Sequence, residues 1–148
     1  MPKIEVSVKI RGPRDKVYKI IKDMENFPHF MREVKNLKII KRMDNALVTA
    51  WEVEVDGAPV NWKEEDYFDD ANYQVRFNML EGNYEEYQGR WMLKDLLGNN
   101  TLLTLEADFD WGIPILEKYV SEALEDKARR SLLGMIQAIK KKAERADV

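Results

Sequence analysis

The chain has 148 residues and a formal net charge of −3, so its length fits one domain spanning residues 1–148 and its charge argues against nucleic acid as a partner. It contains no cysteine, which excludes disulfides, thiolate metal sites and a cysteine nucleophile. His29 is the only histidine, too few for a zinc site built on several histidines, and we expect no metal and no cofactor.

The N-terminal residues alternate between apolar and polar types from Ile4 to Ile10, which predicts a half-buried strand. A helical stripe follows from Arg14 to Met24, and then a second short helix that carries Phe27, Phe30 and Met31 inward. The sequence does not begin with the apolar region of a signal peptide, and no stretch approaches the ~20 apolar residues of a membrane span. We therefore expect a cytoplasmic protein that does not insert stably into a membrane.

Strand-like segments separated by turn residues occupy the middle of the chain. They are predicted at 34–43, 46–56, 59–68, 73–80, 84–94 and 101–111. Because their connectors are short, consecutive strands should be antiparallel neighbours. A helical pattern then runs from Pro114 to about Glu144. We predict an α+β fold: a curved seven-stranded antiparallel sheet wrapped around a long C-terminal helix, with two short helices after the first strand.

Each predicted strand has one apolar face, and the long helix is the only large element available to cover it. The helix stripe is predicted to contain Leu116, Val120, Ala123, Leu124, Ser131, Met135 and Ile139. A helix ~10 Å wide cannot fill the concavity of such a sheet. The space left over would be a cavity lined by aromatic and methionine side chains, which suits a small apolar ligand. The alternative is that these side chains form plain core.

Four segments carry a resemblance to a known superfamily. They are VYKIIKDMENFP at 17–28, VNW at 60–62, EGNY at 81–84 followed by GRW at 89–91, and TLEADF at 104–109. In this order and spacing the chain resembles the START-like, or SRPBCC, helix-grip superfamily over essentially its whole length. Within it, the chain is similar to the bacterial polyketide cyclase/dehydrase and lipid-transport group and its coenzyme Q-binding-like relatives.

The resemblance implies a ligand cavity between the sheet and the last helix. It implies ligand-binding residues on the short helices (Phe27, Met31), on the sheet (Trp51, Trp62, Phe77, Tyr87, Trp91, Leu105, Phe109) and on the last helix (Leu116, Val120, Leu124, Ser131). Strand parity turns Glu64 and Asp66 towards the same interior, where two carboxyls could act as acid and base. Alternatively, they lie solvated at the pocket mouth or pair with Lys or Arg.

Three functions remain open from the sequence. The leading hypothesis is a binder of a lipid, isoprenoid or polyketide-like molecule, as a monomer or homodimer. The second is a polyketide cyclase/dehydrase, although Arg76 is expected to point outward and not to supply the cation of such a site. The third is a ribosome- or membrane-associated module that uses the basic cluster of Lys35, Lys38, Lys41 and Arg42, which is otherwise a solvated face.

Overall fold

The computed structural model describes residues 3–55, 57–82, 86–110 and 114–145, apart from the side chains of residues 114–122 and 124. Its strands are β1 (Lys3–Ile10), β2 (Val34–Met43), β3 (Ala46–Val55), β4 (Ala58–Asp69), β5 (Gln74–Gly82), β6 (Glu86–Leu96) and β7 (Asn100–Asp110). Its helices are α1 (Arg14–Lys22), α2 (Phe27–Phe30) and α3 (Pro114–Ala143), with 3₁₀ turns η1 (Met24–Asn26) and η2 (Asp70–Asn72). The ends of the predicted strands at 56, 84 and 111 lie outside the described residues.

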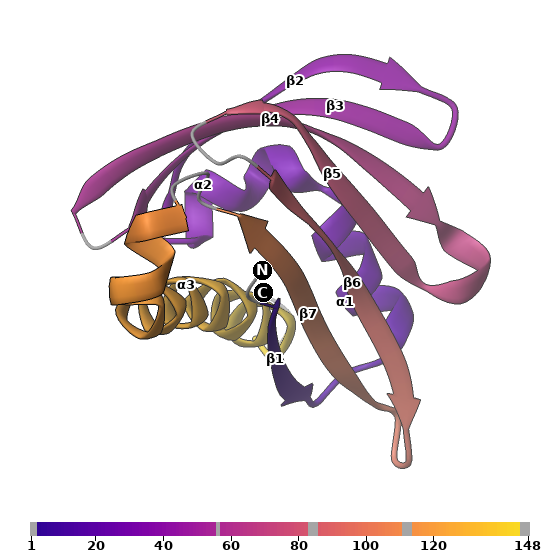
Figure 1. Ribbon diagram of the computed structural model, residues 1–148. Coiled ribbons are helices and arrows are strands. Elements are labelled where there is room, and N and C mark those ends of the chain that lie inside the picture. Colours follow the sequence, from indigo (N-terminus) through magenta and orange to yellow (C-terminus); the bar gives the residue numbers. More distant parts are fainter. Residues whose placement is uncertain (1–2, 56, 83–85, 111–113, 146–148) are drawn as a thin grey trace.

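The seven strands form one curved antiparallel sheet in the order β1-β7-β6-β5-β4-β3-β2 (Figure 1). Consecutive strands from β2 to β7 are neighbours, as the short connecting segments between them in the sequence predict. The β1 strand instead pairs with β7, from Lys3 opposite Asp108 to Ile10 opposite Thr101. The predicted fold class is confirmed, including the short helices between β1 and β2.

The long helix α3 lies on the concave side of the sheet, where its described contacts are mainly with β1 and much fewer with β7 and β3 (Figure 1). Its buried stripe consists of Ala128, Leu132, Met135, Ile136, Ile139 and Ala143. The expectation that Ala123 belongs to this stripe is wrong, since Ala123 is exposed. The helical period was read correctly, but the position of the buried face depends on how α3 docks on β1.

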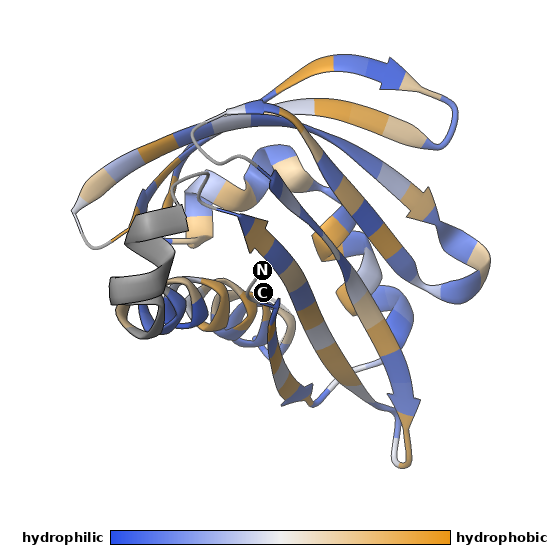
Figure 2. Ribbon diagram, viewed as in Figure 1, coloured by the Kyte–Doolittle hydropathy of each residue, from blue (hydrophilic) through white to orange (hydrophobic). Residues whose placement is uncertain are grey.

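Along the strands, apolar and polar residues alternate as the half-buried pattern requires (Figure 2). In β7 every second residue is buried, from Thr101 to Phe109. A register shift between β4 and β5 sets Lys63 opposite Glu81 but Glu64 opposite Met79. The extra residue therefore lies on β5, and the alternation of β4 continues without a break.

A close approach of backbones makes Gly89 a sensitive position of the sheet. A Cβ there would lie 2.8 Å from both Ala107 Cα and Phe77 Cζ, and would overlap the Glu106 carbonyl oxygen. We predict that Gly89→Ala lowers the free energy of unfolding by about 1–3 kcal/mol in chemical denaturation, as overpacking does. Gly12→Ala is the control, because a Cβ at Gly12 meets nothing within 4 Å. Equal stability of the two variants would contradict this account.

Candidate functional site

A continuous row of aromatic rings crosses the concave face. The Phe27 ring meets Trp51 edge-on at 5.8 Å between centroids, and Trp51 stacks on Trp62 at 5.4 Å and 10°. The row continues from Trp62 to Tyr87 at 5.2 Å and from Tyr87 to Phe109 at 4.8 Å. These separations are those of favourable aromatic pairs. The rings join α2 to β3, β4, β6 and β7 where α3 makes few described contacts.

An apolar cavity lies between this row and α3. It is lined by Val53, Val55, Trp62, Tyr87, Phe109, Ala128, Ser131, Leu132 and Met135. Its volume is about 20 Å³, room for about one water molecule. The cavity that these described residues enclose is therefore much smaller than the width of the sheet suggested, because the aromatic rings fill most of the concavity.

The structure divides the predicted ligand-binding residues into three groups. Four of them line this cavity: Trp62, Tyr87, Phe109 and Ser131. Six are buried in the surrounding core and do not line it: Phe27, Met31, Trp51, Phe77, Trp91 and Leu105. The side chains of Leu116, Val120 and Leu124 lie outside the described residues, so their place at the ligand stays a prediction.

Five lining residues were not predicted to bind ligand: Val53, Val55, Ala128, Leu132 and Met135. Strand parity predicts Val53 and Val55 on the same apolar face as Trp51, and the helix pattern predicts Met135 on the inward stripe, but none of the three was chosen as a ligand-binding residue. Ala128 and Leu132 could not be predicted as lining residues from the sequence, because the angle at which α3 docks on the sheet determines which helix residues face the cavity.

Two carboxyl groups are buried beside the aromatic row. Glu64 is 2% exposed and Asp66 is fully buried, both on the concave face of β4. Trp62 Nε1 donates to Glu64 Oε1 at 2.7 Å. Thr49 Oγ1 donates to Asp66 Oδ2 at 2.6 Å and accepts from Trp51 Nε1 at 2.8 Å. The carboxyl pair thus holds both stacked indoles, one directly and one through Thr49.

Burial raises the pKa of Glu64 well above its usual value, and the neighbouring Asp66 carboxyl raises it further. Burial also raises the pKa of Asp66, while hydrogen bonds from Glu64 and Thr49 act in the opposite direction. Asp66 Oδ1 is buried and has no hydrogen-bond partner, and a proton on Glu64 allows Glu64 to donate to the Asp66 carboxyl. The chemistry of two adjacent buried carboxyls therefore places one shared proton on Glu64, directed at Asp66.

The buried polar side chains of the described residues are Thr49, Glu64, Asp66 and Thr101, so no described lysine or arginine is buried beside the acid pair. The alternative that the two carboxyls lie solvated at the pocket mouth is wrong, and among the described residues neither of them forms an ion pair with a lysine or arginine. Arg76 is exposed, as expected, and its guanidinium lies 3.8 Å from Asp69. The described part of the interior therefore contains acids without a buried cation.

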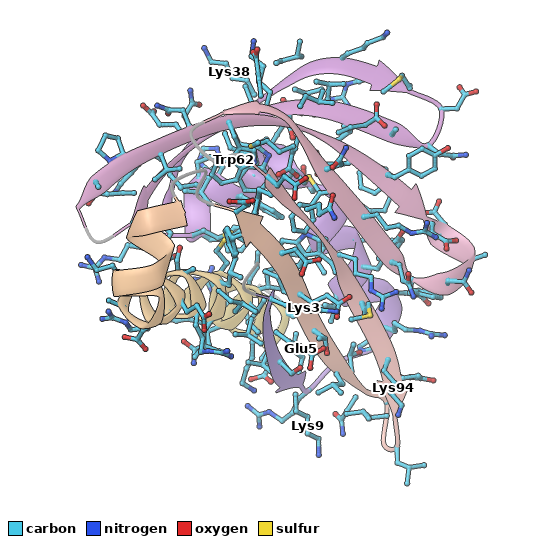
Figure 3. All side chains as sticks on the ribbon, viewed as in Figure 1. Lys3, Glu5, Lys9, Lys38, Trp62 and Lys94 are labelled. Carbon is cyan, nitrogen blue, oxygen red and sulfur yellow. The ribbon has the colours of Figure 1, made fainter. Side chains whose placement is uncertain are left out.

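The outer face of the sheet has a different character. Trp62 points into the concave interior, whereas Lys38 projects from the opposite face (Figure 3). In the basic cluster, Lys35 lies 3.7 Å from Glu54 and Arg42 lies 3.0 Å from Glu25. These exposed pairs are typical of a solvated face. A ribosome or membrane contact at this cluster stays a prediction.

The sequence matches the family described as polyketide cyclase / dehydrase and lipid transport over residues 10–136. The chain belongs to this family. It is superimposable on a protein from Thermus thermophilus with a TM-score of 0.93 at 24% identity, covering 99% of this chain and 100% of the other. No curated protein matches the sequence significantly.

Two further solved structures share the helix-grip fold. The Zhui aromatase/cyclase from Streptomyces sp. R1128 superimposes with a TM-score of 0.88 at 21% identity, covering 97% of this chain and 94% of the other. A START superfamily protein from Mycobacterium smegmatis superimposes with a TM-score of 0.83 at 18% sequence identity. The alignment covers 96% of this chain and 97% of the other. At such identities the likeness establishes the fold alone. Among the described residues, no helix has the length and apolar character needed to cross a membrane.

The shared proton makes stability depend on pH. Because the folded protein holds the Glu64 proton more tightly than the unfolded chain, the free energy of unfolding should fall as pH rises above 4.5, the ordinary pKa. Glutamine preserves an acceptor for Trp62 and a donor for Asp66 but cannot ionise. Glu64→Gln should therefore match wild type near pH 5 and be more stable than wild type at pH 8.

Thermal and urea unfolding across pH measure this difference. The matched control is Glu52→Gln at an exposed position of the adjacent strand β3, which should leave the slope unchanged. Parallel stability curves for wild type and Glu64→Gln would show that Glu64 holds no such proton.

Proposed function

We propose that the protein binds a small hydrophobic molecule between the sheet and α3. The observation that carries this proposal is the apolar cavity, whose described lining contains three aromatic side chains and no charged one. Such a lining suits an apolar ligand, with a few polar groups to orient it. Ser131 and the Tyr87 hydroxyl group are candidates for that orienting role. The family, whose description includes lipid transport, supports the same proposal.

The small cavity volume means that a ligand must enlarge the space it enters. Two features of the lining allow this. Met135 is unbranched and adapts its shape readily. In the described part of the chain, the contacts of α3 with β3 and β7 are few compared with those on β1. Since each methylene buried contributes about 0.8 kcal/mol, an alkyl or isoprenoid body can offset the rearrangement of several side chains.

Ala128→Phe tests the proposed cavity. Ala128 is 5% exposed and lines the cavity, so a phenyl ring at this position would occupy the ligand volume. We expect wild type to bind the apolar dye Nile red saturably and Ala128→Phe to lose at least about tenfold in affinity, or ~1.4 kcal/mol. Fluorescence titration measures the affinity, and far-UV circular dichroism reports whether the variant has folded.

Gln137→Phe is the matched control, because it adds the same ring at an exposed position of the same helix. It should keep wild-type affinity. Native mass spectrometry and solvent extraction of the purified protein give an independent readout of any apolar compound that co-purifies. Failure of wild type to bind any apolar probe would overturn the proposal.

The buried acid pair supports a second proposal, a cyclase/dehydrase activity. In that reaction the proton on Glu64 would pass to a ligand carbonyl oxygen while ionised Asp66 removes a proton from the adjacent carbon, which gives the enol. Trp62 separates Glu64 from the cavity and would have to turn aside.

Conversion of a poly-β-ketone surrogate tests this activity. Glu64→Gln and Asp66→Asn should each abolish turnover while Nile red binding persists. Wild type without turnover would exclude the cyclase/dehydrase proposal and leave the binding proposal intact.

A further inference from the structure

A polar groove of about 700 Å³ crosses β4, β5, β6 and β7 on the face of the sheet away from α3 (Figure 1). The strand register arranges its walls in two rows. The first row consists of Tyr67, Arg76, Arg90 and Glu106, and the second of Glu65, Asn78, Gln88 and Asp108. Matching members are two residues apart along each strand, so the rows lie about 7 Å apart. Between them, Phe77 is buried on the concave side and Gly89 has no side chain, which leaves this space open.

The first row brings two arginines together, which we call the arginine pair. Arg76 and Arg90 are directly opposite each other in the register of β5 and β6, and like charges in this arrangement destabilise a sheet. Arg90 Nε donates to Glu106 Oε1 at 2.6 Å, and Lys3 lies 3.8 Å from the same carboxylate. Arg76 lies 3.8 Å from Asp69, beyond hydrogen-bond distance. Each guanidinium has five N–H donors, so within the described structure most donors of the pair are available to an anionic group.

The second row, the acceptor row, contains no cation. Asn78 and Gln88 are opposite each other in its middle, with Glu65 on one side and Asp108 on the other. Among the described residues, these four side chains form no hydrogen bond and no ion pair. Glu65 and Asp108 are partly buried, so solvent screens their charges less than at an exposed site. An ammonium group between Asn78 and Gln88 would have two amide oxygens to donate to and a carboxylate on either side.

We propose that this groove binds a small zwitterion whose acidic group contacts the arginine pair while its ammonium group lies between Asn78 and Gln88. The two charged groups of such a ligand would be about 7 Å apart, the spacing of the rows. Guanidinium groups bind carboxylates and phosphates through paired N–H donors, which gives the arginine pair its preference for an anion. In the described part of the chain, the groove shares no lining residue with the apolar cavity, so this site is independent of the proposed binding function.

Three ligands with the same five-carbon chain test the proposal. δ-Aminovalerate carries both charges, whereas valerate carries only the negative and pentylamine only the positive one. In a titration at low salt followed by backbone amide NMR shifts of β5 and β6, we expect δ-aminovalerate to bind at least about tenfold more tightly than either ion. Equal or tighter binding of valerate or pentylamine at these strands would overturn the proposal. Displacement of Nile red by δ-aminovalerate would also overturn it, because the zwitterion would then occupy the apolar cavity.

Variants of each row locate the two charges of the ligand. Arg76→Gln leaves the Arg90–Glu106 hydrogen bond in place and should lower the affinity for δ-aminovalerate by about tenfold. Glu65→Gln with Asp108→Asn should remove the preference for δ-aminovalerate over valerate, because the ammonium group then gains no carboxylate.

Lys38→Gln is the matched control, since it removes a cation from the same face of the sheet outside this groove, and it should keep wild-type affinity (Figure 3). Dispersion of the amide signals reports whether each variant has folded. A folded Arg76→Gln variant with wild-type affinity for δ-aminovalerate would show that the arginine pair does not hold the acidic group.

Discussion

One long helix, α3, has to cover the concave face of seven strands. The described contacts of α3 fall mainly on β1, while α1 contacts β6 and α2 contacts β2. The strands between must therefore fill the concavity with their own side chains. Trp51, Trp62, Tyr87 and Phe109 do this as a row of rings in contact with one another. The same constraint explains why the core is rich in aromatic residues and why the cavity lies where the rings meet the helix.

The two buried indole N–H groups of this row each need a hydrogen-bond acceptor, because a buried N–H without a partner destabilises the folded protein. The Glu64 and Asp66 carboxyls meet this need, the second through Thr49. Two ionised carboxyls in an apolar interior would repel each other, and sharing a proton removes that repulsion. Trp62 belongs both to this network and to the cavity wall, so protonation chemistry and cavity shape are linked through a single side chain.

The sequence was sufficient for features that depend on local periodicity. Strand alternation correctly placed Trp62, Tyr87 and Phe109 on the concave face, and it turned Glu64 inward because the bulge lies on β5 and not on β4. Cavity volume could not be predicted in this way, since it depends on how rings of adjacent strands pack in three dimensions.

A polar hollow beside the cavity, lined by Glu33, Glu54, Val55, Lys127, Arg130 and Ser131, was missed for a related reason. Glu33, Glu54 and Arg130 are far apart in the sequence and have no shared pattern. Gly134 leaves space for the Glu33 carboxyl group. From the sequence alone, a glycine inside a helical pattern indicates only a less stable helix.

The position of the hollow also bears on how a ligand gains its space. Moving aromatic rings into water would lose about as much apolar burial as an alkyl chain of similar area gains, so displacement of the rings alone gives no net affinity. Widening the boundary between α3 and β3 keeps the rings in contact with the ligand, and the described contacts there are few. Val55 and Ser131 lie on this boundary and belong to both the hollow and the cavity. A small shift of α3 away from β3 would therefore enlarge the hollow and the binding space together, while the packing on β1 holds the helix in place.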